Sequence, residues 1–352
     1  MTLAPPRPGT RIKLRGVIGE SAARPDAVAK VKGQFQYASD LWREGMLHGA
    51  TLRSPHPYAR IKRIESSTAA KLPGVRAILT QQDVPGKKTY GLMDRDDQPV
   101  LAEELVRYVG EPVAIVAADT IEQARAAAKA IEVAYEPLAG VFDPIAAIQP
   151  GAPPLHPKGN VIERVRIVHG DPAAKAEVVV EGEYEFGMQD QAALGPEAGL
   201  AIPRDDGGVT LHVATQWLHE DLDQLAPCLG LPESKVRIVL AGVGGAFGAR
   251  EDTSIQIHAC LLALRTRRAV RMSYGREESF LGHVHRHPAR LFYAHGATKE
   301  GRLVFVRATI VLDGGAYASS SSAVVANAGS FAAGPYRVPN AVVECVGART
   351  NN

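Results

Sequence analysis

The chain has 352 residues, of which 45% are hydrophobic and 22% charged, a composition typical of a globular protein with a substantial core. The 40 basic and 38 acidic residues leave a formal net charge of +2 without any basic run, so we expect no nucleic-acid partner. No apolar run approaches the roughly 20 residues that cross a bilayer, and the N-terminus lacks a secretory signal. We therefore expect a cytoplasmic protein with no membrane association.

The first half of the chain alternates short strand-like and helical segments, which predicts a small α+β domain over residues 24–143 after an N-terminal lead of residues 1–23. Thr120 and Gln123 have the spacing of a capping box at the start of a predicted helix. The predicted elements are strands at 45–53, 112–119 and 133–138 and a helix at 120–131.

A proline-rich segment separates this region from a second, larger α/β domain. Residues 144–160 hold five prolines without periodicity and are predicted to be a linker. The second domain is expected over residues 161–352. Its predicted elements are strands at 208–215 and 235–242, a helix at 218–230 that ends at Gly230, and a helix at 252–266.

A glycine-rich loop, VGGAFGARED at residues 243–252, follows one of these strands. Glycine tolerates positive φ and close approach, and successive exposed N–H groups bind anions or polarised oxygens. The phosphate-binding motifs do not match, because Ala249-Arg250-Glu251 replaces the Lys-Ser/Thr of a P-loop and Phe247 replaces the third glycine of a dinucleotide fingerprint. A nucleotide-binding loop and a plain tight turn with Phe247 packed in the core both remain alternatives to another ligand.

Several segments, in order, resemble the xanthine dehydrogenase and aldehyde oxidase family of molybdenum hydroxylases. GVGGAFGARE is similar to the family's GGGFGGKE loop, and GMQDQAALGPEAGLA is similar to its Gln-x-His-x-x-Leu-Glu segment, with Gln191 in place of the histidine. MLHGATLRSPHPYARI and YVGEPVAIVAADT resemble the family's N-terminal domain. Several of these segments are most similar to the stand-alone molybdenum-binding subunit of bacterial xanthine dehydrogenases. The resemblance implies an α+β fold in which an α/β hammerhead domain precedes the first part of a molybdopterin-binding α/β domain.

The resemblance also implies roles for particular residues. In the family a pterin dithiolene holds the molybdenum, so the protein supplies no direct metal ligand. Gln189 matches the amide donor to the apical oxo ligand, and Glu251 matches the acidic residue that faces the substrate. We expect Glu251 to be ionised because it lies at a predicted helix N-terminus. Asn327 aligns with a substrate-clamping arginine of the animal xanthine enzymes but supplies no charge. The turn against the metal centre is Gly245, Ala246, Phe247 and Gly248.

The reaction implied by the resemblance is hydroxylation of purines, related heterocycles or aldehydes with oxygen from water. The expected cofactor is molybdenum–molybdopterin, in its cytosine dinucleotide form. Electrons would pass to 2Fe-2S clusters and FAD on partner subunits, since Cys228, Cys260 and Cys345 lack cluster spacing. Family members carry a further cofactor motif and a general-base glutamate beyond the segment that ends at Asn352. We therefore expect the N-terminal portion of the subunit, inactive without a C-terminal remainder; the alternative is a non-catalytic assembly piece.

Two further groups of residues carry less specific signals. His283, His285 and His287 lie on one side of a possible strand, with a spacing that would suit zinc or copper. The resemblance instead implies a structural segment without metal at these residues. Asp190 and Glu197 are either an acid–base pair or ordinary loop residues.

Overall fold

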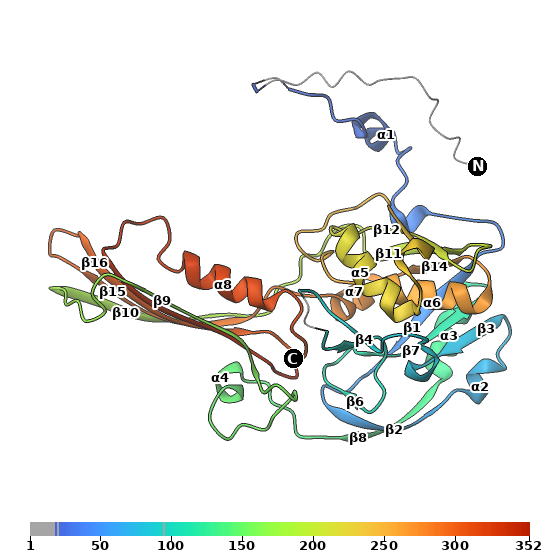
Figure 1. Ribbon diagram of the computed structural model, residues 1–352, viewed down its shortest axis with the longest axis horizontal. Coiled ribbons are helices and arrows are strands. Elements are labelled where there is room, and N and C mark those ends of the chain that lie inside the picture. Colours follow the sequence, from blue (N-terminus) through green and yellow to red (C-terminus); the bar gives the residue numbers. More distant parts are fainter. Residues whose placement is uncertain (1–17, 20, 94–95) are drawn as a thin grey trace. The chain divides into compact units, whose positions relative to one another are not determined.

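A computed structural model describes residues 18–19, 21–93 and 96–352 of the chain. The chain forms two compact units, Met1–Gln36 and Tyr37–Asn352. The first contains α1 (Ala27–Val31), which begins after Asp26. Most of the expected N-terminal lead lies outside the described residues. The other helices and strands described below belong to the second unit (Figure 1).

A seven-stranded sheet forms the centre of the second unit, in the order β13-β12-β11-β14-β1-β7-β3. Strand β1 pairs in parallel with β14, with Leu47 opposite Val270, so one sheet joins strands from both sides of residues 144–160. The strands are β1 (Leu47–Arg53), β3 (Val75–Leu79), β7 (Pro112–Ala118), β11 (Ala198–Pro203), β12 (Val209–Val213), β13 (Val236–Leu240) and β14 (Val270–Ser273).

Helices cover both faces of this sheet, which explains the continuous apolar run in β7. Every residue of β7 is buried. Ile115 belongs to the core shared with α5 (Leu218–Leu229) and α6 (Gln256–Thr266), whereas Val116 belongs to the core shared with α3 (Ile121–Ala130). Alternate residues of a strand point to opposite faces, so a strand between two helical layers must be apolar throughout.

Two predicted helix boundaries are confirmed. The Thr120 hydroxyl accepts a hydrogen bond from the Gln123 backbone at 3.3 Å, and the Gln123 side chain accepts one from the Thr120 backbone at 3.1 Å, so α3 begins with the expected capping box. Gly230 ends α5 in the left-handed conformation, with φ of 63°.

The predicted start of the next helix, at residue 252, is wrong. Helix α6 begins at Gln256, whose side-chain oxygen accepts hydrogen bonds from the backbone N–H groups of Ser254 and Ile255 at 2.7 and 2.9 Å. These bonds hold the preceding backbone in a turn instead of a helical repeat. Glu251 therefore does not lie at a helix N-terminus.

A separate five-stranded sheet has the order β10-β15-β16-β17-β9. Helix α8 (Ser321–Phe331) lies along it (Figure 1), and Val325 of this helix packs with Ile310 and Cys345 of the sheet. The strands are β9 (Val161–His169), β10 (Val178–Phe186), β15 (Ala289–Ala297), β16 (Leu303–Asp313) and β17 (Asn340–Ala348).

Smaller elements complete the unit. The Asp143 side chain accepts hydrogen bonds from the backbone N–H groups of Ile145 and Ala146 at 2.7 and 2.9 Å, and so caps a short helix inside the expected linker. The remaining elements are α2 (Ser67–Ala70), α4 (Pro144–Ala147), α7 (Arg276–Gly282), β2 (Ala59–Glu65), β4 (Thr89–Tyr90), β5 (Gln98–Pro99), β6 (Leu105–Val106), β8 (Glu132–Pro137) and three 3-10 turns, Ala38–Asp40, Gln81–Asp83 and Glu233–Lys235.

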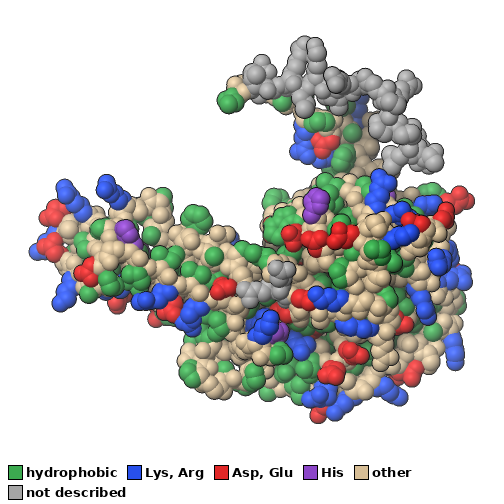
Figure 2. All heavy atoms as spheres, in the orientation of Figure 1, with side chains coloured by type: hydrophobic (Ala, Val, Ile, Leu, Met, Phe, Trp, Pro, Cys, Tyr) green, Lys and Arg blue, Asp and Glu red, His purple; other side chains and the backbone are tan. Residues whose placement is uncertain are grey.

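Charged side chains of both signs are interspersed over the face seen in Figure 2. None of the described helices has the length and apolar character needed to cross a membrane.

Candidate functional site

The glycine-rich loop after β13 has a strained conformation. Gly245, Phe247 and Gly248 have φ values of 109°, 56° and 89°. A left-handed conformation costs a residue with a side chain about 1–3 kcal/mol and persists only where its surroundings fix it. Phe247 is 77% exposed, so the alternative that it packs in the core is wrong.

Arg250 anchors this loop to a buried partner. Its guanidinium donates a hydrogen bond from Nη1 to Oε1 of Glu197 at 2.8 Å and another from Nη2 to the carbonyl of Gly195. The Gln216 backbone also donates to the Arg250 carbonyl at 2.8 Å. Glu197 is therefore a buried ion-pair partner of Arg250, and it does not meet Asp190 in an acid–base pair.

Two glycines allow the loop and the segment after Gln189 to touch through their backbones. The Gly195 N–H donates to the Gly244 carbonyl at 3.1 Å. A Cβ atom on Gly244 would lie 2.9 Å from the Gly195 Cα atom, closer than real side chains approach. This contact requires glycine and brings two segments that are distant in sequence into one site.

Four of the predicted site residues line a single cavity of about 660 Å³: Gln189, Phe247, Gly248 and Glu251. Strands β15 and β16 and helix α8 supply its apolar wall. Gly245 and Ala246 lie in the same turn without lining the cavity. Asn327 is exposed on α8 and also does not line the cavity, so the structure does not bring it together with the other four.

The loop beside the cavity has backbone donors without partners and two carboxyl groups with raised pKa values. The backbone N–H groups of residues 246–248 donate to no other described residue. Burial raises the pKa of Glu251, whereas a helix N-terminus would lower it. Burial also raises the pKa of neighbouring Asp252 to about 6, although Ser319 donates a hydrogen bond to it at 2.9 Å. Burial therefore shifts both carboxyl groups of the loop toward their protonated forms.

A second cavity of about 410 Å³ shares residues 284–287 and Ser319 with the first. Tyr108 and Val109, which precede β7, contribute to its wall together with Phe280 of α7. The region before residue 143 therefore helps to shape the surroundings of the glycine loop.

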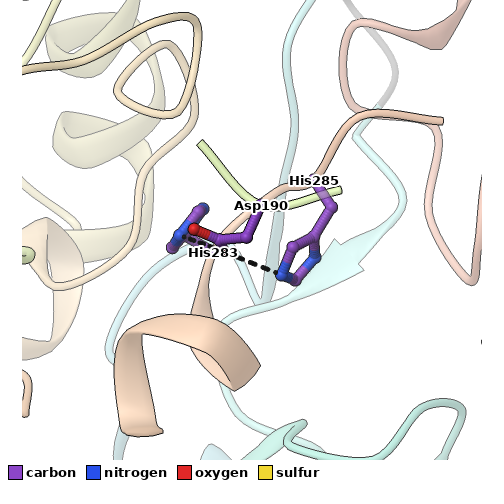
Figure 3. Close-up of side chains that lie close together, drawn as sticks. All are labelled: Asp190, His283 and His285. Carbon is purple, nitrogen blue, oxygen red and sulfur yellow. Dashed lines mark ion pairs between the residues drawn. The ribbon is translucent and has the colours of Figure 1, made fainter. Parts of the chain in front are cut away.

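The histidine segment is not the strand that the sequence suggested, and its three histidines do not converge. His287 Nε2 lies 2.8 Å from the Ser321 hydroxyl. The other two, His283 and His285, lie beside Asp190 (Figure 3). Sequence reasoning missed this grouping because Asp190 is distant in sequence and approaches only where the Arg286 backbone bonds to Gln189.

Comparisons with known proteins agree with this architecture. A family model described as the aldehyde oxidase and xanthine dehydrogenase a/b hammerhead domain matches residues 32–139, and one described as a molybdopterin cofactor-binding domain matches residues 155–352. The chain belongs to the xanthine dehydrogenase and aldehyde oxidase family of molybdenum hydroxylases. The expected α+β fold, with a hammerhead domain and a molybdopterin-binding domain, is confirmed.

Individual relatives refine the comparison. The chain is 41% identical over 335 residues to a probable xanthine dehydrogenase subunit from Bacillus subtilis (strain 168), covering 94% of this chain and 45% of that protein. It is 36% identical over 339 residues to the nicotinate dehydrogenase large molybdopterin subunit of Eubacterium barkeri, covering 96% and 80%. It superposes on aldehyde oxidoreductase from Desulfovibrio gigas with a TM-score of 0.89 at 30% identity, covering 94% and 38%. The chain thus spans less than half the length of the first and third of these proteins.

Proposed function

We propose that this chain holds a molybdenum–molybdopterin cofactor in the 660 Å³ cavity as part of a xanthine dehydrogenase-type hydroxylase. The conformation of Phe247 carries the proposal. The buried Arg250 and the Gly195–Gly244 contact fix the turn, yet Phe247 is 77% exposed. A strained backbone that gains no packing is characteristic of a residue held for a ligand.

The residues present fit such a cofactor. Its metal is held by the pterin, so the protein needs hydrogen-bond donors and space instead of metal ligands. Three consecutive N–H groups at residues 246–248 are without partners among the described residues. A side chain at Gly248 would meet no atom within 4 Å, which leaves open space against the turn.

The chain's own side chains then have distinct tasks. The Gln189 amide and the N–H groups of residues 246–248 would donate hydrogen bonds to oxygen atoms of the cofactor, as preorganised donors do. When bound, the cofactor supplies the two-electron oxidation and the water-derived oxygen. Glu251, which lines the cavity, would form a hydrogen bond with a substrate nitrogen and so orient the ring.

The substrate class we propose is a nitrogen heterocycle or an aldehyde. Two of the relatives above are named for xanthine and nicotinate, and the third for aldehydes. Asn327, exposed on α8, would contribute a neutral hydrogen-bonding group to that substrate only if further parts of the enzyme close over it. The cytosine dinucleotide form of the cofactor is proposed because these relatives are bacterial.

A C-terminal remainder of the subunit would complete the cofactor site. Electrons would leave this subunit through partners that carry 2Fe-2S clusters and FAD. Cys228, Cys260 and Cys345 are buried and unpaired, and burial raises the pKa of each thiol. Thiolates are the form that binds clusters, so these cysteines are poor cluster ligands.

The test is the molybdenum and pterin content of the protein isolated from its native source together with its associated subunits. We expect stoichiometric molybdenum with iron in excess, and a large loss of molybdenum in Gln189→Leu. The exposed Gln82 provides a matched control, and Gln82→Leu should retain the metal. A folded wild-type protein without molybdenum would overturn the proposal.

A further inference from the structure

The grouping of Asp190, His283 and His285 has the geometry of ligands around one ion (Figure 3). Asp190 Oδ2 lies 3.0 Å from Nε2 of His283 and 3.1 Å from Nε2 of His285. All three ligand atoms lie within 4.8 Å of one another. The side chains are 16%, 4% and 20% exposed, respectively, so they are largely shielded from water.

A hydrogen bond of the His283 ring indicates which of its two nitrogens carries the hydrogen. His283 Nδ1 lies 2.6 Å from the Val284 carbonyl, which only accepts, so Nδ1 carries the hydrogen. In neutral His283 the Nε2 atom then carries a lone pair, and it lies 3.0 Å from a carboxylate oxygen. Metal-binding histidines are oriented in this way, with the second nitrogen bonded to a carbonyl.

The carboxylate oxygen is also left unsatisfied. Asp190 Oδ2 is buried and forms no hydrogen bond with any described residue, although two ring nitrogens lie within 3.1 Å. The N–H directions of the rings therefore do not point at it. A buried carboxylate oxygen without a hydrogen-bond donor, beside two imidazole nitrogens, is costly unless a cation lies among them.

We propose that Asp190, His283 and His285 bind a divalent transition metal, and that zinc is the ion they suit. Zinc takes imidazole nitrogen and carboxylate oxygen at about 2.0–2.2 Å, which places tetrahedral ligand atoms about 3.3 Å apart. The separations of 3.0 and 3.1 Å are close to that value. His285 lines both cavities, so a fourth position is open to water.

The site would tie together two segments of the cavity wall. Asp190 directly follows Gln189, while the two histidines come from the segment after α7. A backbone hydrogen bond, from Arg286 to the Gln189 carbonyl at 3.0 Å, already joins these segments. A bound ion would fix the position of Gln189. Asp190 and His285 line the same cavity as Gln189, but none of the three proposed ligands is among the groups assigned to the molybdenum cofactor.

The test is zinc binding by the full-length protein after chelator treatment, measured by equilibrium dialysis with elemental analysis. We expect one zinc per chain. Asp190→Asn and His283→Gln should weaken the zinc affinity by about 100-fold or more. Loss of an outer-shell partner already costs up to about 100-fold, and these two residues are proposed as direct ligands. His287→Gln, from the same segment, and the exposed His219→Gln should retain wild-type affinity.

Cobalt substitution provides a second measurement on the wild-type protein. A visible spectrum of four-coordinate cobalt supports the site even if Asp190→Asn fails to fold, and the absence of bound cobalt and zinc overturns it. Equal zinc content in all variants, or equal loss in His287→Gln, would also overturn it. Molybdenum is measured in the same samples, so loss of one metal is distinguished from loss of the other.

Discussion

Replacing Arg250 with methionine should strongly destabilise the unit Tyr37–Asn352. The side chains of Arg250 and Glu197 are 3% and 2% exposed and are joined by a 2.8 Å hydrogen bond. A hydrogen bond between charged groups contributes about 1.5–3 kcal/mol, and its loss leaves a buried carboxylate without a partner. Breaking a buried ion pair in this way costs about 3–5 kcal/mol in total. We expect that loss in the free energy of unfolding of Arg250→Met.

Urea titration followed by far-UV circular dichroism measures this loss. The exposed pair of Arg164 and Glu344, with side chains 51% and 38% exposed, provides the control, and Arg164→Met should cost less than about 1 kcal/mol. The double variant Arg250→Met/Glu197→Leu should be more stable than Arg250→Met alone, because no buried charge remains. Equal losses in Arg250→Met and Arg164→Met would refute the assignment of Arg250 as the anchor of the loop.

Three other variants test separate features. Burial raises the pKa of Asp221 from 3.8 to about 7. Between these values the folded protein retains a proton that the unfolded chain has released. The free energy of unfolding should therefore fall as pH rises from about 4 to 7. Urea titrations at about pH 5 and about pH 8 should show Asp221→Asn losing less stability than wild type across this range, whereas Asp223→Asn, an exposed aspartate on the same helix, should match wild type. Gly244→Ala should displace the loop and lower molybdenum content, because its Cβ would lie 2.9 Å from the Gly195 backbone; wild-type content would contradict this. Phe247→Gly should change the free energy of unfolding by less than about 1 kcal/mol, since relief of strain offsets the added freedom of the unfolded chain. It should nevertheless lose molybdenum, and unchanged metal content would count against the role of the ring.

Local signals in the sequence predicted the elements whose causes are local. The spacing of Thr120 and Gln123 predicts the start of α3, and Gly230 predicts the end of α5, because caps depend on residues within one turn. The start of α6 is also locally caused, but by Gln256 bonding its own preceding backbone. Helical periodicity contains no signal for that bond, so the prediction began four residues too early.

Only those site residues that match the family motifs, and the conformations of the loop glycines, could be predicted from the sequence. Positive φ at Gly245 and Gly248 follows from residue type, whereas positive φ at Phe247 depends on contacts with a distant segment. The partner of Arg250 is Glu197, and nothing near either residue in the sequence indicates the pairing. The proximity of Asp190 and His283 could not be predicted for the same reason, because tertiary packing alone brings these residues together.

The parallel pairing of β1 with β14 has a consequence for the nascent chain. Strand β1 is completed early in synthesis, but the strand beside Leu47 is absent until Val270 has left the ribosome. Until then β1 presents an open edge, and open edges of apolar strands recruit strands from other molecules. Truncated chains that end between the two family domains would keep that edge permanently, and we expect them to aggregate. Chaperone dependence of this protein should accordingly be greatest while residues between the two strands are being translated.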